Sequence, residues 1–190
     1  MTEISDKTAA AKAPLAPALE RFVLHWGDMG GQWGVNRSVS QIHALLYLSE
    51  RPLTAEEIAD TLGLARSNVS NSIRELMSWN LIRRVPVRGD RRDHFEAEAD
   101  VWEMFVRIAA GRKEREIDPA IAALRQCLAE ADADAAIHPL ARERLRNMLE
   151  FVGTMETWYA QMLSVPKSKL AALIRLGARI VKFLPGDGKR

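Results

Sequence analysis

Short polar side chains and arginines recur along RSNVSNSIRELMS, residues 66–78. A rotation of 100° per residue places Ser67 and Asn71 opposite the apolar positions, with Arg74 on the flank. An asparagine amide can pair with adenine, a serine hydroxyl can contact a phosphate or a base edge, and an arginine can do either. This face predicts contacts with nucleic acid, and a plain solvated helix face is the competing interpretation. The candidate contact residues are Arg66, Ser67, Asn68, Asn71 and Arg74.

Arginines are also concentrated in the turn RGDRRD, residues 88–93. Between residues 81 and 95, five arginines stand against two acids. Such a turn presents guanidinium groups to a phosphate backbone or to a minor groove. Asp90 or Asp93 could instead pair with Arg92 and hold the turn in shape. The candidate contact residues of this turn are Arg88, Arg91 and Arg92.

The remaining reactive residue types do not form a catalytic pattern. The four histidines and the one cysteine lack the spacing of metal ligands. The sequence also shows no nucleophile beside a base and no glycine loop that cradles phosphate. We therefore expect no catalytic residue, no metal, no cofactor and no enzymatic activity. Cys127 lies in an apolar helical stretch, which predicts a buried thiol.

Helices must position these residues, because apolar positions recur at intervals of three and four along most of the chain. One region, residues 81–99, alternates instead and predicts a β-hairpin with Gly89-Asp90 in its turn. Pro86 suits an exposed edge strand, since it cannot donate a ladder hydrogen bond. The helices ahead of the hairpin are predicted at about 16–33, 39–50, 54–62 and 66–79.

The stretch TAEEIADTLGLARSNVSNSIREL has the features of a helix-turn-helix. Thr54 and Glu57 form a capping-box pair, and Gly63 suits the left-handed residue that ends the first helix. Ala65 provides no side-chain cap, so Ser67 is an alternative start for the second helix. The shared core is predicted to contain Ile58, Leu62, Leu64, Val69, Ile73, Leu76 and Met77.

After the hairpin, a helix is predicted over about 101–117, with a bend and a new helix starting at Asp118-Pro119. Two more helices follow, at about 139–163 and 168–184. One of them carries a heptad stripe, which predicts a partner helix and hence a dimer interface. The stripe consists of Met148, Phe151, Met155, Trp158 and Met162. A rival interpretation of the last helix is a basic amphipathic helix on a membrane surface.

The sequence also resembles a known family. The run LGLARSNVSNSIRELMSWNLIRRVPVRGDRRDHFEAEADVWEMF, with VNRSVSQIHALLYLSERPLTAEEIAD before it, resembles the GbsR branch of the MarR-like winged helix-turn-helix transcriptional regulators. The resemblance covers about residues 20–118. It implies a homodimer that reads a pseudo-palindromic site in double-stranded DNA, usually as a repressor controlled by an effector. It also places Ser67, Asn68 and Asn71 on the recognition helix, and Arg88, Arg91 and Arg92 on the wing.

Aromatic residues suggest a site for the effector. Some GbsR-like regulators respond to choline or related quaternary ammonium compounds, and aromatic rings hold such cations by cation–π attraction. By this analogy the candidate effector-binding residues are Trp26, Trp33, Trp102, Trp158 and Tyr159. The simpler alternative is that most of the five tryptophans belong to the core.

The predicted fold class is mainly α, a winged helix-turn-helix with one β-hairpin wing and long N- and C-terminal dimerisation helices. We expect a flexible tail over 1–15, an N-terminal helix joining the dimer region over 16–35, the DNA-binding domain over 36–100 and a dimerisation and effector region over 101–190. A single cysteine, no secretory signal and no apolar run long enough to span a membrane favour the cytoplasm.

The predicted function is sequence-specific DNA binding by a homodimeric repressor under effector control. The alternative is a winged-helix module that binds proteins without reading DNA. Glu75 on the polar face and a net charge of only +2 favour that alternative. The operator, the regulated genes and the effector are not encoded in any motif. Nor do the residues distinguish repressor from activator or identify the helices at the dimer axis.

Overall fold

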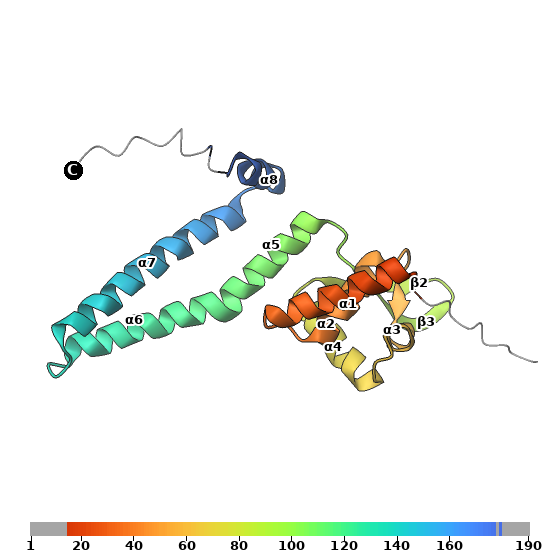
Figure 1. Ribbon diagram of the computed structural model, residues 1–190, viewed down its shortest axis with the longest axis horizontal. Coiled ribbons are helices and arrows are strands. Elements are labelled where there is room, and N and C mark those ends of the chain that lie inside the picture. The colour runs from red at the N-terminus through yellow and green to blue at the C-terminus, as the bar shows by residue number, and fades with distance from the viewer. Residues whose placement is uncertain (1–14, 178, 180–190) are drawn as a thin grey trace, which may run out of the picture. The chain divides into compact units, whose positions relative to one another are not determined.

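The computed structural model describes residues 15–177 and residue 179. These residues form two compact units that divide between Ala99 and Asp100, with a small three-stranded sheet in the first and helices in both (Figure 1). The predicted tail, except for its last residue, and the end of the predicted last helix lie outside the described residues. The mainly helical winged fold is confirmed.

The first unit begins with two helices packed along each other, α1 (Pro17–Gln32) and α2 (Arg37–Leu48). A Cβ on Gly27 would lie 2.5 Å from Gln41 Cγ, so only glycine allows this close approach. The α2 helix is buried from Val39 to Leu46, and Asn36 caps it by accepting a hydrogen bond from the Ser38 amide. The α2 helix therefore forms the centre of this unit.

The helix-turn-helix consists of α3 (Ala55–Leu62) and α4 (Arg66–Ser78). The predicted capping box is confirmed, since Thr54 and Glu57 exchange backbone and side-chain hydrogen bonds, and Gly63 ends α3 at φ +63°. Hydrogen bonds from Arg51, then from Thr54, lower the pKa of the Glu57 carboxyl to about 2. The α4 helix starts at Arg66 without a side-chain cap, so the alternative start at Ser67 is wrong.

The sheet has the order β1-β3-β2 and is antiparallel throughout. The hairpin strands β2 (Ile82–Val87) and β3 (Asp90–Ala97) were predicted, whereas β1 (Leu53–Thr54) is too short for a periodicity to show. Val87 pairs with Asp90, so the turn residues are Arg88 and Gly89 rather than Gly89 and Asp90. The register is irregular around Pro86, as its missing donor requires.

The core between the helix-turn-helix helices matches the prediction closely. Ile58, Val69, Ile73 and Leu76 are at most 5% exposed. Leu62, Leu64 and Met77 are half-buried at the edge of this core. His43 of α2 is buried as well, and its Nε2 has no hydrogen-bond partner among the described residues.

The second unit begins with α5 (Val101–Arg112), which continues through a π-helical turn at Lys113–Ile117 into α6 (Asp118–Ala133). The predicted helix beginning at Asp118 corresponds to α6, and the helical axis changes direction at this junction (Figure 1), but Asp118 is the first residue of α6 and not its N-cap. A proline within a helix removes one donor and crowds the carbonyl four residues before it. The wider hydrogen-bonding turn directly before Pro119 accommodates both effects.

The α7 helix (Pro139–Ser164) packs against α6, and α8 (Lys167–Leu176) follows it and packs against α5 (Figure 1). Tyr159 of α7 donates a hydrogen bond of 2.8 Å to the Ala109 carbonyl of α5. Lys167 lies 3.0 Å from an Asp100 carboxylate oxygen and 2.8 Å from one of Glu103. These contacts hold both later helices against α5.

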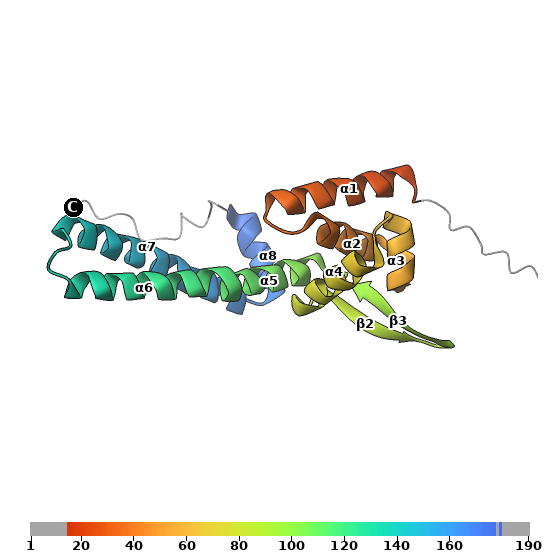
Figure 2. The same cartoon turned by 90° about the horizontal axis from the view of Figure 1, so that it is seen from below.

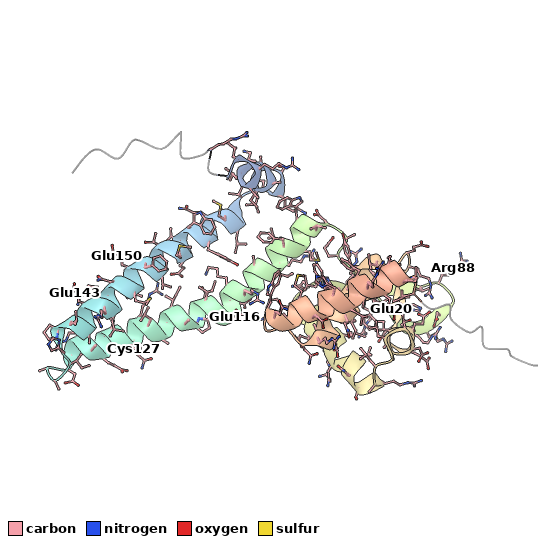
Figure 3. All side chains as sticks on the ribbon, in the orientation of Figure 1. Glu20, Arg88, Glu116, Cys127, Glu143 and Glu150 are labelled. Atoms are coloured by element: carbon pink, nitrogen blue, oxygen red, sulfur yellow. The ribbon has the colours of Figure 1, made fainter. Side chains whose placement is uncertain are left out.

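Several side chains expected in the core are not buried. Cys127 is exposed on α6, which overturns the prediction of a buried thiol (Figure 3). None of the five tryptophans is buried, and Trp33 and Trp158 are 64% and 51% exposed. The α7 stripe is exposed as well at Met148, Phe151, Met155 and Trp158. A single chain thus leaves much of its apolar surface uncovered.

Candidate nucleic-acid interface

The polar face of α4 points away from the core, as its sequence predicted. Its buried positions Val69, Ser72, Ile73 and Leu76 face the rest of the unit. The exposed positions lie on the opposite side of the helix. They are Arg66, Ser67, Ser70, Asn71, Arg74, Glu75 and Ser78. Ser70 was not among the predicted contact residues, although its position in the helical period places it within this face.

The two asparagines of α4 have different surroundings. Asn68 is half-buried, and its amide donates a hydrogen bond of 2.9 Å to Ser38 Oγ of α2. The buried Ser72 hydroxyl donates to the Asn68 carbonyl oxygen at 3.3 Å. Asn71 is exposed and accepts a hydrogen bond from Arg74. Asn71 therefore presents its amide group to solvent, while Asn68 joins α4 to α2.

The hairpin projects beyond the helices of its unit, and Arg88 lies at its tip (Figures 2 and 3). Arg92 is exposed but held by Asp90, with Nη2 2.6 Å from Oδ2 and Nε 3.0 Å from each carboxylate oxygen. These hydrogen bonds from Arg92 hold the pKa of the Asp90 carboxyl well below its usual range. Asp90, and not Asp93, is thus the residue that restrains Arg92.

Arg88 and Arg91 differ from the other arginines of the hairpin. Both are exposed, and neither forms an ion pair with a described residue. Arg83 lies 2.6 Å from Glu96, and Arg84 lies 3.4 Å from Asp93. The hairpin arginines that form no ion pair with a described residue are therefore those at and next to the turn.

Glu56, in the first turn of α3, was missed by the sequence interpretation. Its Oε1 lies 2.5 Å from Arg66 Nη2, and its Oε2 lies 3.9 Å from Arg92 Nη1. Glu56 precedes these arginines by 10 and 36 residues, so no local pattern links them. Only the fold brings the first turn of α3, the start of α4 and strand β3 together at one carboxylate.

The predicted effector residues are divided between the two units. Trp26 and Trp33 belong to the first unit, and Trp26 stacks on Phe22 with ring centroids 5.5 Å apart. Trp102, Trp158 and Tyr159 belong to the second unit. Burial raises the pKa of the Tyr159 hydroxyl, which is already bonded to the Ala109 carbonyl.

The described residues contain no group of three or more histidine, cysteine, aspartate or glutamate side chains that could hold a metal ion. Among the same residues, no helix is long and apolar enough to cross a membrane.

Comparisons with known proteins agree with this geometry. The MarR family model matches residues 33–93, from the end of α1 into β3. The HTH-type transcriptional repressor GbsR of Bacillus subtilis is 23% identical over 157 residues, which is 83% of this chain and 85% of that protein. The HTH-type transcriptional regulator YvaV of the same organism is 24% identical over 89 residues, 47% of this chain. That match spans only about half (50%) of the length of YvaV.

A solved structure described as a transcriptional regulator has the same fold, with a TM-score of 0.53 and 26% identity. The match covers 77% of this chain and 96% of that one. These relatives are regulators of transcription and not enzymes. The order helix-turn-helix and wing, the family match over residues 33–93 and these relatives together support a MarR/GbsR-like winged-helix transcriptional regulator.

Proposed function

We propose that this protein binds double-stranded DNA in a sequence-specific manner, with α4 in the major groove and the hairpin along the phosphate backbone or in the minor groove. One observation carries the proposal: the exposed polar face of α4 and two unpaired wing arginines belong to the same winged unit. Asn71 is suited to reading a base edge, and Arg88 and Arg91 are suited to phosphates. Arg66, Ser67, Arg74 and Arg92 complete the interface.

Asn68 has a positioning role in this proposal. Its bond to Ser38 joins α4 to α2, and the bond that it accepts from Ser72 within α4 orients its side chain. Because those bonds already use its amide and carbonyl groups, direct contact with a base falls to Asn71.

The working form of the protein in this proposal is a homodimer. Four side chains of the α7 stripe, Met148, Phe151, Met155 and Trp158, are 44–64% exposed, and neighbouring exposed apolar side chains of this kind mark interaction surfaces. A second copy offers the same stripe, so an isologous contact would bury both at once. Two winged units related by twofold symmetry would read a pseudo-palindromic operator.

Repression and control by an effector complete the proposal. The relative GbsR is named a repressor, which favours the same sign of regulation here. The exposed or half-buried Trp102, Trp158 and Tyr159 are candidates for holding a cation such as a quaternary ammonium compound by cation–π attraction. Trp26 and Trp33 remain candidates on α1. The cytoplasm, where DNA is accessible, is the proposed location.

Selection of bound duplexes from a random pool tests this function. The full-length protein is incubated with the pool at near-physiological salt, and bound duplexes are amplified and sequenced over several rounds. Enrichment of one motif with internal twofold symmetry would support a dimer that reads DNA. Failure to enrich any motif would instead favour the protein-binding module, for which exposed Glu75 on α4 is the best structural argument.

A further inference from the structure

The carboxylate of Glu56 lies between two arginines of the proposed DNA-binding surface. Arg66 is the first residue of α4, and Arg92 lies on the wing strand β3. Glu56 comes within 2.5 Å of the first and 3.9 Å of the second. All three side chains are about half exposed or more, so this carboxylate is at the surface that a duplex would approach.

Charges in this group balance before any DNA is bound. Glu56 and Asp90 supply two negative charges, and Arg66 and Arg92 supply two positive charges. An arginine that already faces a carboxylate attracts a phosphate less than a free arginine does, because the field of the carboxylate opposes the approach. The carboxylate also repels the phosphate directly.

We infer that Glu56 acts as an internal competitor for DNA phosphate: its carboxylate occupies Arg66 and Arg92 in the free protein and so weakens binding to duplexes of any sequence. The inference rests on the proposed DNA-binding function. It goes beyond that function by assigning a role to a residue that is not part of the proposed DNA-binding interface. Contacts between exposed charges are weak, so DNA can displace the carboxylate.

The test compares Glu56→Gln with the unchanged protein on a random-sequence duplex. Glutamine retains the size of the side chain and removes its charge. We expect affinity to rise about 3- to 10-fold at low salt. We also expect the plot of log K against log salt to steepen by about 1 per protomer, because one compensating charge is removed.

Asp60→Asn is the matched control. Asp60 is exposed one turn further along α3, and it forms no ion pair with any described side chain. This variant changes the net charge by the same amount but releases no arginine. It should therefore increase affinity clearly less than Glu56→Gln does.

A third comparison isolates the arginines. In a protein that already carries Arg66→Ala and Arg92→Ala, Glu56→Gln should have no more effect than Asp60→Asn. The inference is overturned if Glu56→Gln matches the control in the otherwise unchanged protein, if it weakens binding, or if its gain survives loss of both arginines. If the unchanged protein binds neither random nor selected duplexes, the proposed function itself fails, which is a distinguishable outcome.

Discussion

Removing the two unpaired wing arginines should flatten the salt dependence of DNA binding. The double substitution Arg88→Ala and Arg91→Ala deletes two exposed guanidinium groups that form no ion pair with a described residue. In a dimer that makes four positive charges. Each phosphate contact contributes about 0.9 to the slope of log K against log salt, so we expect the slope to fall by about 3 to 4.

The consequence for affinity follows from that slope. Between about 50 and about 200 mM salt, the unchanged protein should lose roughly 100-fold more affinity than the variant. The assay is fluorescence anisotropy of a labelled duplex, titrated with protein at four or more salt concentrations. Both a selected duplex and a random duplex should show the change, because phosphates carry no sequence information.

Arg88→Lys with Arg91→Lys is the control for charge. Lysine can also bind phosphate as a point charge, so the slope should stay near that of the unchanged protein. If the alanine variant retained the full slope, the wing arginines would not contact phosphates. A lysine variant as flat as the alanine variant would show that the effect depends on something other than charge.

Three further predictions follow from particular contacts. Asn71→Ala should weaken binding to a selected duplex by about 1 to 3 kcal/mol and barely affect a random one, as binding isotherms would show, and equal losses on the two duplexes would exclude base reading by Asn71. Asn68→Ala should instead lower the free energy of unfolding, measured by urea unfolding, by about 1 kcal/mol, because it breaks the bond to Ser38. Burial lowers the pKa of His43 from 6.5 to about 4, so the contribution of the neutral imidazole to the free energy of unfolding is complete above pH 6.5 and is lost as the pH falls toward 4. In urea unfolding, the unchanged protein should lose about 2 to 3 kcal/mol more of its free energy of unfolding than His43→Leu does between pH 7.5 and pH 4.5. Parallel pH profiles of the two proteins would contradict this. Phe151→Lys with Met155→Lys should convert dimers to monomers in analytical ultracentrifugation. The control Glu150→Lys, at an exposed position outside the stripe, should leave the dimer intact. If the double variant also remained dimeric, the interface would lie elsewhere.

The helix-turn-helix was predictable because its signals are local. The capping box of Thr54 and Glu57, the left-handed Gly63 and the apolar period of α4 each depend on residues close in sequence. The hairpin was predictable for the same reason. Its turn was misplaced by one residue, because Asp90 pairs with Val87 in the ladder.

Features that depend on contacts between distant residues were missed or misjudged. A helical wheel places Asn68 on the flank of α4 but does not show that Ser38 lies within hydrogen-bond distance of it. The contacts of Glu56 with Arg66 and Arg92 likewise come only from the fold. At Asp118-Pro119, the local rule placed the start of α6 correctly, but it did not show that a π-helical turn joins α6 to α5 without a break.

Burial was the least predictable property of the second unit. Apolar spacing on α7 indicates a face that needs a partner, but it does not say whether the partner is in the same chain. The structure leaves Phe151 and Trp158 exposed, so the described part of the chain does not provide the partner. Cys127 shows the same problem, since its apolar neighbours in sequence do not cover it in space.

If α4 and the wing read a DNA sequence, the protein must distinguish two duplexes that differ only in the order of their bases. Full-length protein is titrated by fluorescence anisotropy against a duplex enriched from the random pool and against the same duplex with its bases scrambled, at near-physiological salt. We expect binding to the enriched duplex to be tighter by a factor of ~10³ or more. Equal affinity for the two duplexes would contradict sequence reading and leave only attraction to phosphates.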